Sequence, residues 1–266
     1  MVVASRGYDR RYTVADIDLD LFLEHFDNLD GGRNRQPSTL GAWSPERLRT
    51  FLEKQCSFNQ RRNRIPGSFI VDHDEAFDII GKLAGQYGPL DLIHMDSHAD
   101  LGTGLCDLAW IDIGSRLLGF DSARRPGAIL REGDHGMSPA NYLAFVLACR
   151  WLKSLVYVHH PSGADDLMPF FFRDFDITNG VIEMRFVPEG LDEAIKALSR
   201  DRLRALPHHL EPAIPFRKVA TCDFSAATSF DFVIVCQSPG YTPIETDGLI
   251  PVFVDYVDFD APLTPD

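Results

Sequence analysis

LIHMDSHADL, residues 92–101, is an apolar run that ends in Asp96, His98 and Asp100. Alternate residues of an extended chain point the same way, and the carboxyl ends of parallel strands face the crevice where ligands bind. If the run is a strand of a parallel sheet, it offers two carboxylates and an imidazole to one point. Such a mixed set suits manganese, iron or zinc. The alternative is a solvated turn whose aspartates cap a helix.

A second histidine follows the strand predicted just before this one. In FIVDHDEAF, His73 comes directly after a short apolar run. Only one predicted helix, Glu75–Tyr87, separates the two strands, so their ends can be neighbours. The alternative is a histidine that merely caps or hydrogen-bonds the chain. Asp72 and Asp74 are either partners of His73 or a helix cap, and the sequence does not separate these roles.

A third acidic pattern lies near the N-terminus. Tyr12–Phe22, YTVADIDLDLF, alternates apolar and acidic residues and predicts a strand with Asp16, Asp18 and Asp20 on one side. Three like charges on one side repel one another, which is tolerable with cations bound or with full exposure. An exposed edge strand is the alternative, although the interleaved residues are too apolar to favour it.

Helical and extended segments alternate along the chain and predict an α/β fold with a mostly parallel sheet. Ser44 as N-cap and Pro45 at the first helical position start one helix, near residues 44–55. No repeat or linker marks a boundary, so we expect one domain, residues 1–266. Further strands are expected at 68–71, 90–95, 155–159, 181–187 and 230–236, further helices at 75–87, 139–151 and 191–206, and a helix or strand at 251–256.

Composition narrows the classes of function. The formal net charge of −13 disfavours nucleic acid as a partner, because an acidic surface repels the phosphate backbone. No apolar run reaches the about 18 residues of a membrane span, and the N-terminus lacks the apolar core of a signal peptide. The five cysteines form no CxxC pair, which favours a reducing cytoplasm over a disulfide framework. Whether the chain forms a homo-oligomer stays open.

Together the three motifs resemble those of the arginase/agmatinase (ureohydrolase) superfamily. His73 matches the histidine of the family's Gly-Asp-His segment, although the glycine is absent here. Asp96, His98 and Asp100 match its Asp-Ala-His-x-Asp segment, with Ser97 in place of the alanine. The resemblance implies a three-layer arginase-like fold that holds two manganese ions.

The family's Asp-x-Asp segment normally comes late in the chain, where this sequence has only the weaker candidate RDFD, with Asp174 and Asp176. DIDLDLF at the N-terminus resembles the D-x-D-x-D-[FY]-F run of the uncharacterised-family-0489 proteins, distant ureohydrolase relatives, with Leu21 for the first aromatic. Their late motif is also similar to FVIVCQSPGYTP here. The resemblance therefore implies a permuted fold in which one metal-binding strand is N-terminal.

The activity implied by this resemblance is that of a manganese-dependent ureohydrolase. The group of this short architecture is the peptide arginases, which convert arginine side chains of ribosomally made precursor peptides to ornithine and urea. Two divalent cations, Mn²⁺ or another metal, would activate water for attack on the guanidinium carbon, and their charge would balance four carboxylates. The implied partner is an arginine-containing precursor peptide. The implied ligands are Asp18, Asp20, His73, Asp96, His98 and Asp100.

Two residues are candidates for proton transfer. Asp100, by family analogy, would pass a proton to the leaving amine, and His135 in a Gly-rich loop is a candidate shuttle or an ordinary exposed histidine. Candidates for substrate binding are Asp16, Asp74, Asn141, Gln237 and Ser238. Aromatic candidates for a peptide groove, with core packing as the alternative, are Trp110, Tyr142, Phe170–Phe172 and Tyr241.

Three other functions fit parts of the sequence. Free arginine or agmatine is the first alternative substrate. A haloacid-dehalogenase-like phosphatase would use Asp16 or Asp18 as nucleophile with Mg²⁺, and would need Lys218 as its late lysine. A non-catalytic peptide-binding protein on a decayed ureohydrolase fold is the third, and it gives no reason to keep a full set of metal ligands.

Overall fold

Among the residues that the computed structural model describes, eight strands form the main sheet and two more form a separate antiparallel pair. The structure describes residues 11–25, 41–59, 64–102, 108–163, 166–197, 200–261 and 263. The strands are β1 (Thr13–Asp18), β2 (Ile65–Ile70), β3 (Leu90–Asp96), β4 (Leu152–His159), β5 (Val181–Ile182), β6 (Arg185–Phe186), β7 (His209–Leu210), β8 (Ile214–Ala220), β9 (Phe232–Cys236) and β10 (Val257–Asp258).

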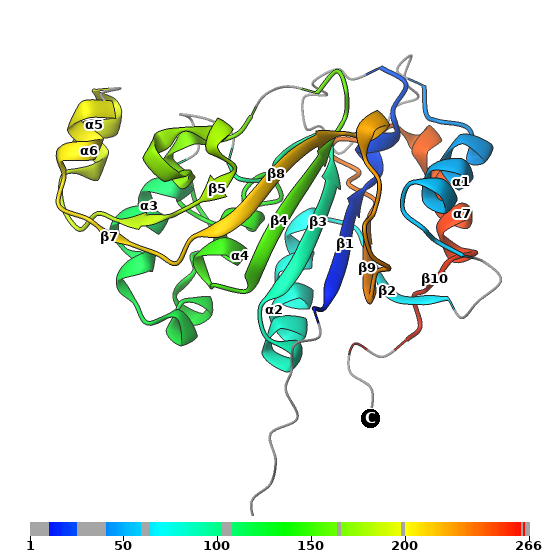
Figure 1. Ribbon diagram of the computed structural model, residues 1–266, viewed down its shortest axis with the longest axis horizontal. Helices are drawn as coiled ribbons and strands as arrows, with labels where there is room; N and C mark the ends of the chain where they lie inside the picture. Colours follow the sequence, from blue (N-terminus) through cyan, green and yellow to red (C-terminus); the bar gives the residue numbers. More distant parts are fainter. Residues whose placement is uncertain are drawn as a thin grey trace, which may run out of the picture.

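The order in the main sheet is β10-β2-β9-β1-β3-β4-β8-β5, and β6 pairs with β7 (Figure 1). Only β5 runs antiparallel to its neighbour in the main sheet; the other pairings are parallel. The predicted α/β class with a mostly parallel sheet is therefore confirmed. The helices are α1 (Pro45–Lys54), α2 (Ala76–Tyr87), α3 (Ala109–Ser115), α4 (Tyr142–Ala148), α5 (Leu191–Lys196), α6 (Arg200–Ala205) and α7 (Ile250–Val254).

The N-terminal strand lies in the middle of the sheet. β1 pairs in parallel with β3 on one side and with β9 on the other. The strand carrying Asp16 and Asp18 therefore lies beside the strand that ends at Asp96, as a permuted fold with an N-terminal metal-binding strand requires. An exposed edge strand is excluded, because all six residues of β1 are buried.

Helices cover both faces of the sheet. Val14 packs into a core with residues of α2 and α4, whereas Ala15 and Ile17 pack into a second core with residues of α1 and α7. Because successive side chains of a strand point to opposite faces, both faces of β1 are closed from water. This burial explains the near-continuous apolar character of the central strands. Figure 1 shows α1 and α7 together on one side of the molecule, away from α2, α3 and α4.

Local signals place two helix ends as predicted. Ser44 Oγ accepts a hydrogen bond from the Arg47 amide, with Pro45 in the first turn of α1. Gly88 ends α2 with a φ of 81°, a conformation that glycine adopts without steric cost.

Several predicted bounds are wrong. The predicted strand Tyr12–Phe22 ends at Asp18, because the Asp18 carboxylate accepts the Asp20 amide at 2.9 Å and starts a 3₁₀ turn, Leu19–Phe22. The predicted helix 139–151 is confined to α4, since Asn141 is held in the preceding loop.

Two more predicted elements, the strand 181–187 and the helix 191–206, also differ from the structure. Residues 181–187 form β5 and β6, which belong to different sheets, and residues 191–206 form α5 and α6. No sequence pattern predicted α3 or β8. The single domain 1–266 stays a prediction, and Cys106 lies outside the described residues.

Candidate metal centre

The register of the sheet brings the predicted ligands to one edge. Asp18 is the last residue of β1 and lies beside Cys236, the last residue of β9. One pleat earlier, Asp16 lies beside His94 of β3, and β3 ends at Asp96. Since parallel strands end at the same edge, carboxylates from two chain segments far apart in sequence converge there.

The turn after β1 supplies the next carboxylate. Asp20 Oδ1 accepts the Ser97 amide at 3.1 Å, and Asp20 Oδ2 lies 2.9 Å from His98 Nδ1. Asp96 Oδ1 accepts the His98 amide at 2.7 Å. The 3₁₀ turn therefore docks onto the loop after β3 and places Asp20 beside His98.

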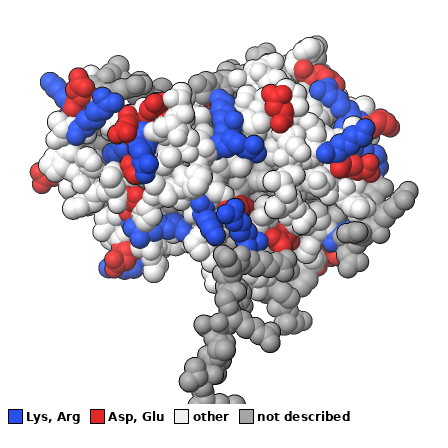
Figure 2. Space-filling model, viewed as in Figure 1, with Lys and Arg blue, Asp and Glu red and all other residues white. Residues whose placement is uncertain are grey.

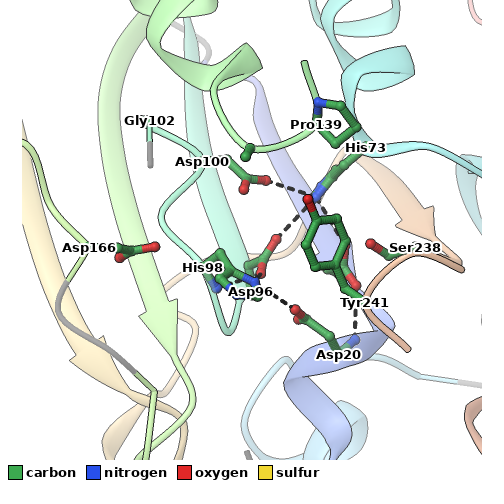
Figure 3. A pocket seen from close by; sticks show the side chains of 12 residues that line it. Asp20, His73, Asp96, His98, Asp100, Gly102, Pro139, Asp166, Ser238 and Tyr241 are labelled. Carbon is green, nitrogen blue, oxygen red and sulfur yellow. Dashed lines mark hydrogen bonds and ion pairs between the residues drawn. The ribbon is translucent and has the colours of Figure 1, made fainter. Parts of the chain in front are cut away.

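Three carboxylate oxygens converge on one nitrogen of His73. Its Nδ1 lies 3.1 Å from Asp18 Oδ2, 3.1 Å from Asp96 Oδ2 and 3.0 Å from Asp100 Oδ2 (Figure 3). An imidazole nitrogen carries one proton at most, so it cannot donate to three acceptors at full strength. Asp100 Oδ2 is buried, and the described residues offer it no hydrogen-bond donor besides this shared His73 nitrogen. The geometry therefore leaves negative charge uncompensated at this point.

Potential ligand atoms fall into three overlapping groups within the described residues. Each group has ligand atoms within 4.8 Å of one another, and Asp96 and His73 are each shared by two groups. The groups are His73, His94, Asp96 and Asp100; Asp18, His73 and Cys236; and Asp20, Asp96 and His98. All six predicted ligands therefore lie in one contiguous cluster with room for more than one cation.

A layer of buried side chains supports this cluster from below. Asp16, which is fully buried, lies 3.1 Å from His73 Nε2 and 3.1 Å from His94 Nδ1, and it accepts a hydrogen bond from the Tyr142 hydroxyl. A carboxylate on the far nitrogen of a ligating histidine fixes its ring orientation and its tautomer. Asp16 therefore contacts His73 on Nε2, the nitrogen opposite the one that meets the other carboxylates, and orients the ring.

Burial and mutual repulsion shift the pKa values within the cluster. Burial, with the charge of Asp96, raises the pKa of Asp100 to about 7. Burial alone lowers the pKa of His98, but hydrogen bonds to Asp20 and Asp96 reverse this effect and raise it to about 12. In the same way, Asp16 outweighs burial and raises the pKa of His94 to about 9. Without a metal, protons on the histidines balance part of the carboxylate charge.

The cluster forms the floor of a pocket of about 330 Å³. No lysine or arginine is among the described residues that line it. The Tyr241 ring lies over the carboxylates, 5.5 Å from the His98 ring between centroids (Figure 3). The lining residues are Asp18, Asp20, His73, Asp96, His98, Asp100, Gly102, Pro139, Ala140, Asp166, Ser238 and Tyr241. A cation is the ligand that this pocket favours electrostatically.

These acidic groups are separate from the charge on the outer surface. On the face seen in Figure 2, acidic and basic side chains lie side by side rather than in regions of one sign. The acidic character of the pocket comes from its own aspartates, of which Asp18, Asp20, Asp96 and Asp100 are buried.

The other predicted site residues are spread more widely. Ser238 lines the pocket, with a φ of 50°. Gln237 donates to Asp247 at 2.9 Å, and Asn141 holds its own loop through Ser138 and Gly136. These two, with the half-buried Asp74 and the buried Asp16, are not among the described lining residues.

His135 is exposed, and its Nδ1 lies 3.1 Å from the Leu108 carbonyl rather than in the pocket. The structure therefore does not bring this candidate shuttle to the carboxylates. Lys218, which a phosphatase would need, lies over the Tyr157 ring at 5.8 Å and is not a described lining residue. Asp176 caps the Thr178 amide in another loop, so RDFD does not join the cluster.

Among the aromatic candidates for a peptide groove, only Tyr241 lies at the pocket. Phe170, Phe171 and Phe172 are buried in the core, as are Trp110 and Tyr142. These five rings are buried and so do not line a peptide groove, and the Tyr142 hydroxyl donates to Asp16 instead.

Sequence reasoning missed His94, Cys236 and Asp166. His94 interrupts the apolar strand β3, and a buried histidine there is a signal that a partner such as Asp16 lies alongside. Cys236 reads as a small apolar residue of β9, and Asp166 belongs to a loop without a pattern.

The donor set fits divalent metal ions. It combines carboxylates with imidazoles, all but His98 buried, and three of its carboxylate oxygens share one nitrogen of His73. Comparison of the chain with protein-family models, with curated proteins and with solved structures gave no match. Within the described residues, no helix has the length and apolar character needed to cross a membrane.

Proposed function

We propose that this chain is a metal-dependent hydrolase that cleaves the guanidinium group of arginine side chains in a peptide, giving ornithine and urea. The observation that carries the proposal is the convergence of three buried carboxylate oxygens on His73 Nδ1. Buried carboxylates at such separations are unfavourable unless cations compensate them. The resemblance of the same residues to ureohydrolase motifs supports manganese and a guanidinium substrate.

Six residues would hold two cations. Asp20, Asp96 and His98 form one group of ligand atoms, and His73 joins Asp96 and Asp100 in another, with Asp18 beside His73. When bound, two divalent cations would supply Lewis acidity that makes a water molecule nucleophilic at neutral pH. Asp16 and His94 would keep the His73 ring in position behind them.

Asp100 is suited to move the proton that the reaction requires. Water adds to the guanidinium carbon, the bond from that carbon to the side-chain nitrogen breaks, and the nitrogen leaves as the ornithine amine. Asp100 lines the pocket, and in the metal-free protein burial and the charge of Asp96 raise the pKa of its carboxyl to about 7. It can therefore take a proton from the attacking water and deliver it to the leaving amine.

The resemblance to the peptide arginases favours a peptide over free arginine. The pocket lining includes no described lysine or arginine that would bind an α-carboxylate. In a peptide that group is a neutral amide. Gly102, Pro139 and Ala140 at the pocket wall offer uncharged contacts to such a backbone.

Mass spectrometry tests the proposal directly. With Mn²⁺ added, an arginine-containing peptide should lose about 42 Da per converted residue, and urea should appear in equal amount. Free arginine and agmatine are run in parallel. Hydrolysis of these with untouched peptides would overturn the peptide substrate, and no urea from any of the three would overturn the ureohydrolase activity.

A further inference from the structure

One carboxylate of the pocket is not part of any candidate metal group. Asp166 lies in the loop after β4 and lines the same pocket as the six predicted ligands. In Figure 3 it lies across the pocket from Ser238, beyond His98. Its carboxylate is absent from the three groups of ligand atoms found among the described residues. Asp166 is therefore the one aspartate among the described lining residues that stands outside the candidate metal groups.

The orientation of this carboxylate is fixed on one side only. Asp166 Oδ2 accepts the Ala99 amide at 2.8 Å, which ties it to the loop between His98 and Asp100. Asp166 Oδ1 is buried and has no hydrogen-bond partner among the described residues. A buried carboxylate oxygen without a donor is costly, so the pocket favours a ligand that brings one.

Charge compensation leaves Asp166 as the residual negative group. Five aspartates line the pocket, and two divalent cations would neutralise the four that belong to the metal groups. No described lysine or arginine of the lining pairs with Asp166. A bound cation with N–H donors would satisfy both its charge and its open oxygen. A guanidinium suits this position better than an ammonium, because it is planar, weakly hydrated and presents several N–H donors.

We propose that Asp166 is a specificity-determining residue, which accepts a hydrogen bond from the substrate's guanidinium and selects it over neutral isosteres. The inference rests on the proposed function for the identity of the substrate. It rests on this pocket alone for the preference for a cation. Asp166 holds the guanidinium against the loop that carries His98 and Asp100, so the carbon to be attacked faces the metal ligands.

The test compares two blocked amino-acid amides that differ in charge. N-acetyl-arginine amide carries the guanidinium, and N-acetyl-citrulline amide is its neutral isostere. The variant Asp166→Asn keeps an oxygen for the Ala99 amide but removes the charge. Asp201→Asn, at a side chain that is 97% exposed, is the matched control. The proteins are loaded with Mn²⁺, and their metal content is measured by elemental analysis.

Wild type should bind the arginine probe more tightly than the citrulline probe, measured as KM where urea is released and as Kd by calorimetry where it is not. Asp166→Asn should weaken the arginine probe by about tenfold to a hundredfold, the loss expected for a charged hydrogen bond, with citrulline binding and metal content unchanged. The control should match wild type.

An Asp166→Asn variant that keeps the full preference for arginine would overturn the inference. So would a wild type that binds both probes equally. A wild type that prefers arginine through Asp166 but releases no urea supports the inference and overturns the proposed function, so the two failures are distinguishable.

Discussion

Two clusters of buried charge in this molecule are compensated in opposite ways. Arg125 is 2% exposed, and its five N–H groups donate to three main-chain carbonyls and to both oxygens of Glu211. Arg150 also donates to Glu211, at 2.6 Å. Donors and acceptors match, so this cluster is complete without a ligand.

In the Asp–His cluster at the carboxyl edge of the sheet, by contrast, donors and acceptors do not match, so this cluster is incomplete without a ligand. Its buried aspartates outnumber its histidines, and Asp18, Asp96 and Asp100 share a single nitrogen of His73. The chain thus satisfies buried charge where the role is structural, and leaves it open at the pocket. Uncompensated charge of this kind indicates a bound cation rather than a stability device.

The largest expected effect is a loss of activity when a histidine of the pocket is replaced, compared with a histidine of the surface. His98→Ala should lower activity by about a thousandfold or more, because one of the groups of metal ligands loses its imidazole. His208→Ala is the control, since His208 is exposed and lies against its own loop at Leu206. Urea release from the peptide measures both. Equal activity of the two variants would contradict the site.

A mutation in the cluster of Arg125, Arg150 and Glu211 should change the stability of the protein rather than its activity. Glu211→Gln should lower the free energy of unfolding by about 3 kcal/mol, because it leaves Arg125 buried without a full partner. Metal content should not change. Two arginines outweigh burial and lower the pKa of Glu211, so its contribution is present above its unfolded value and is lost as pH falls through the folded pKa. Denaturant unfolding at several pH values measures the difference in unfolding free energy between wild type and Glu211→Gln, and this difference should disappear in acid.

Metal binding to the incomplete cluster should release protons. His98 has a pKa of about 12 and Asp100 of about 7 in the metal-free protein, so both bind protons that a cation must displace. The apparent affinity for Mn²⁺ should therefore rise with pH, by about tenfold per unit for each proton released. Calorimetry in buffers of different ionisation enthalpy measures the release, and a heat independent of the buffer would contradict it.

Removing one repelling carboxylate should stabilise the metal-free protein. Asp100→Asn is a matched change, since asparagine also tolerates the φ of 48° at this position. We expect a gain of about 1 kcal/mol in unfolding free energy without metal, and a loss of the stabilisation that Mn²⁺ gives to wild type. Thermal unfolding with and without chelator measures both. If Asp100→Asn is less stable than wild type without metal, the claim that the metal-free Asp–His cluster carries uncompensated repulsion is wrong.

The sequence predicted those parts that depend on short-range pattern. The apolar run into Asp96, His98 and Asp100 marked a strand end, and the apolar residues between the N-terminal aspartates argued against an exposed edge. The place of that strand beside the one ending at Asp96 followed from the resemblance and its permuted order. The predictions were less accurate where side chains redirect the backbone. Asp18 caps the Asp20 amide and turns the chain, an interaction that a strand pattern does not reveal.

Long-range partners explain the remaining misses. His94 reads as one more residue of a buried strand until Asp16 is placed next to it by the register of β1 and β3. Asp166 has no periodic neighbours, and only the folded loop after β4 brings it to the Ala99 amide. Roles of this kind depend on tertiary contacts between distant segments, which no local spacing encodes.

Elemental analysis of the protein purified without chelator and then dialysed against Mn²⁺ tests the central claim most directly. The incomplete Asp–His cluster predicts about two divalent ions per chain. His98→Ala should hold fewer, and Glu211→Gln should hold as many as wild type. A folded wild-type protein that binds no divalent ion under these conditions would contradict the account.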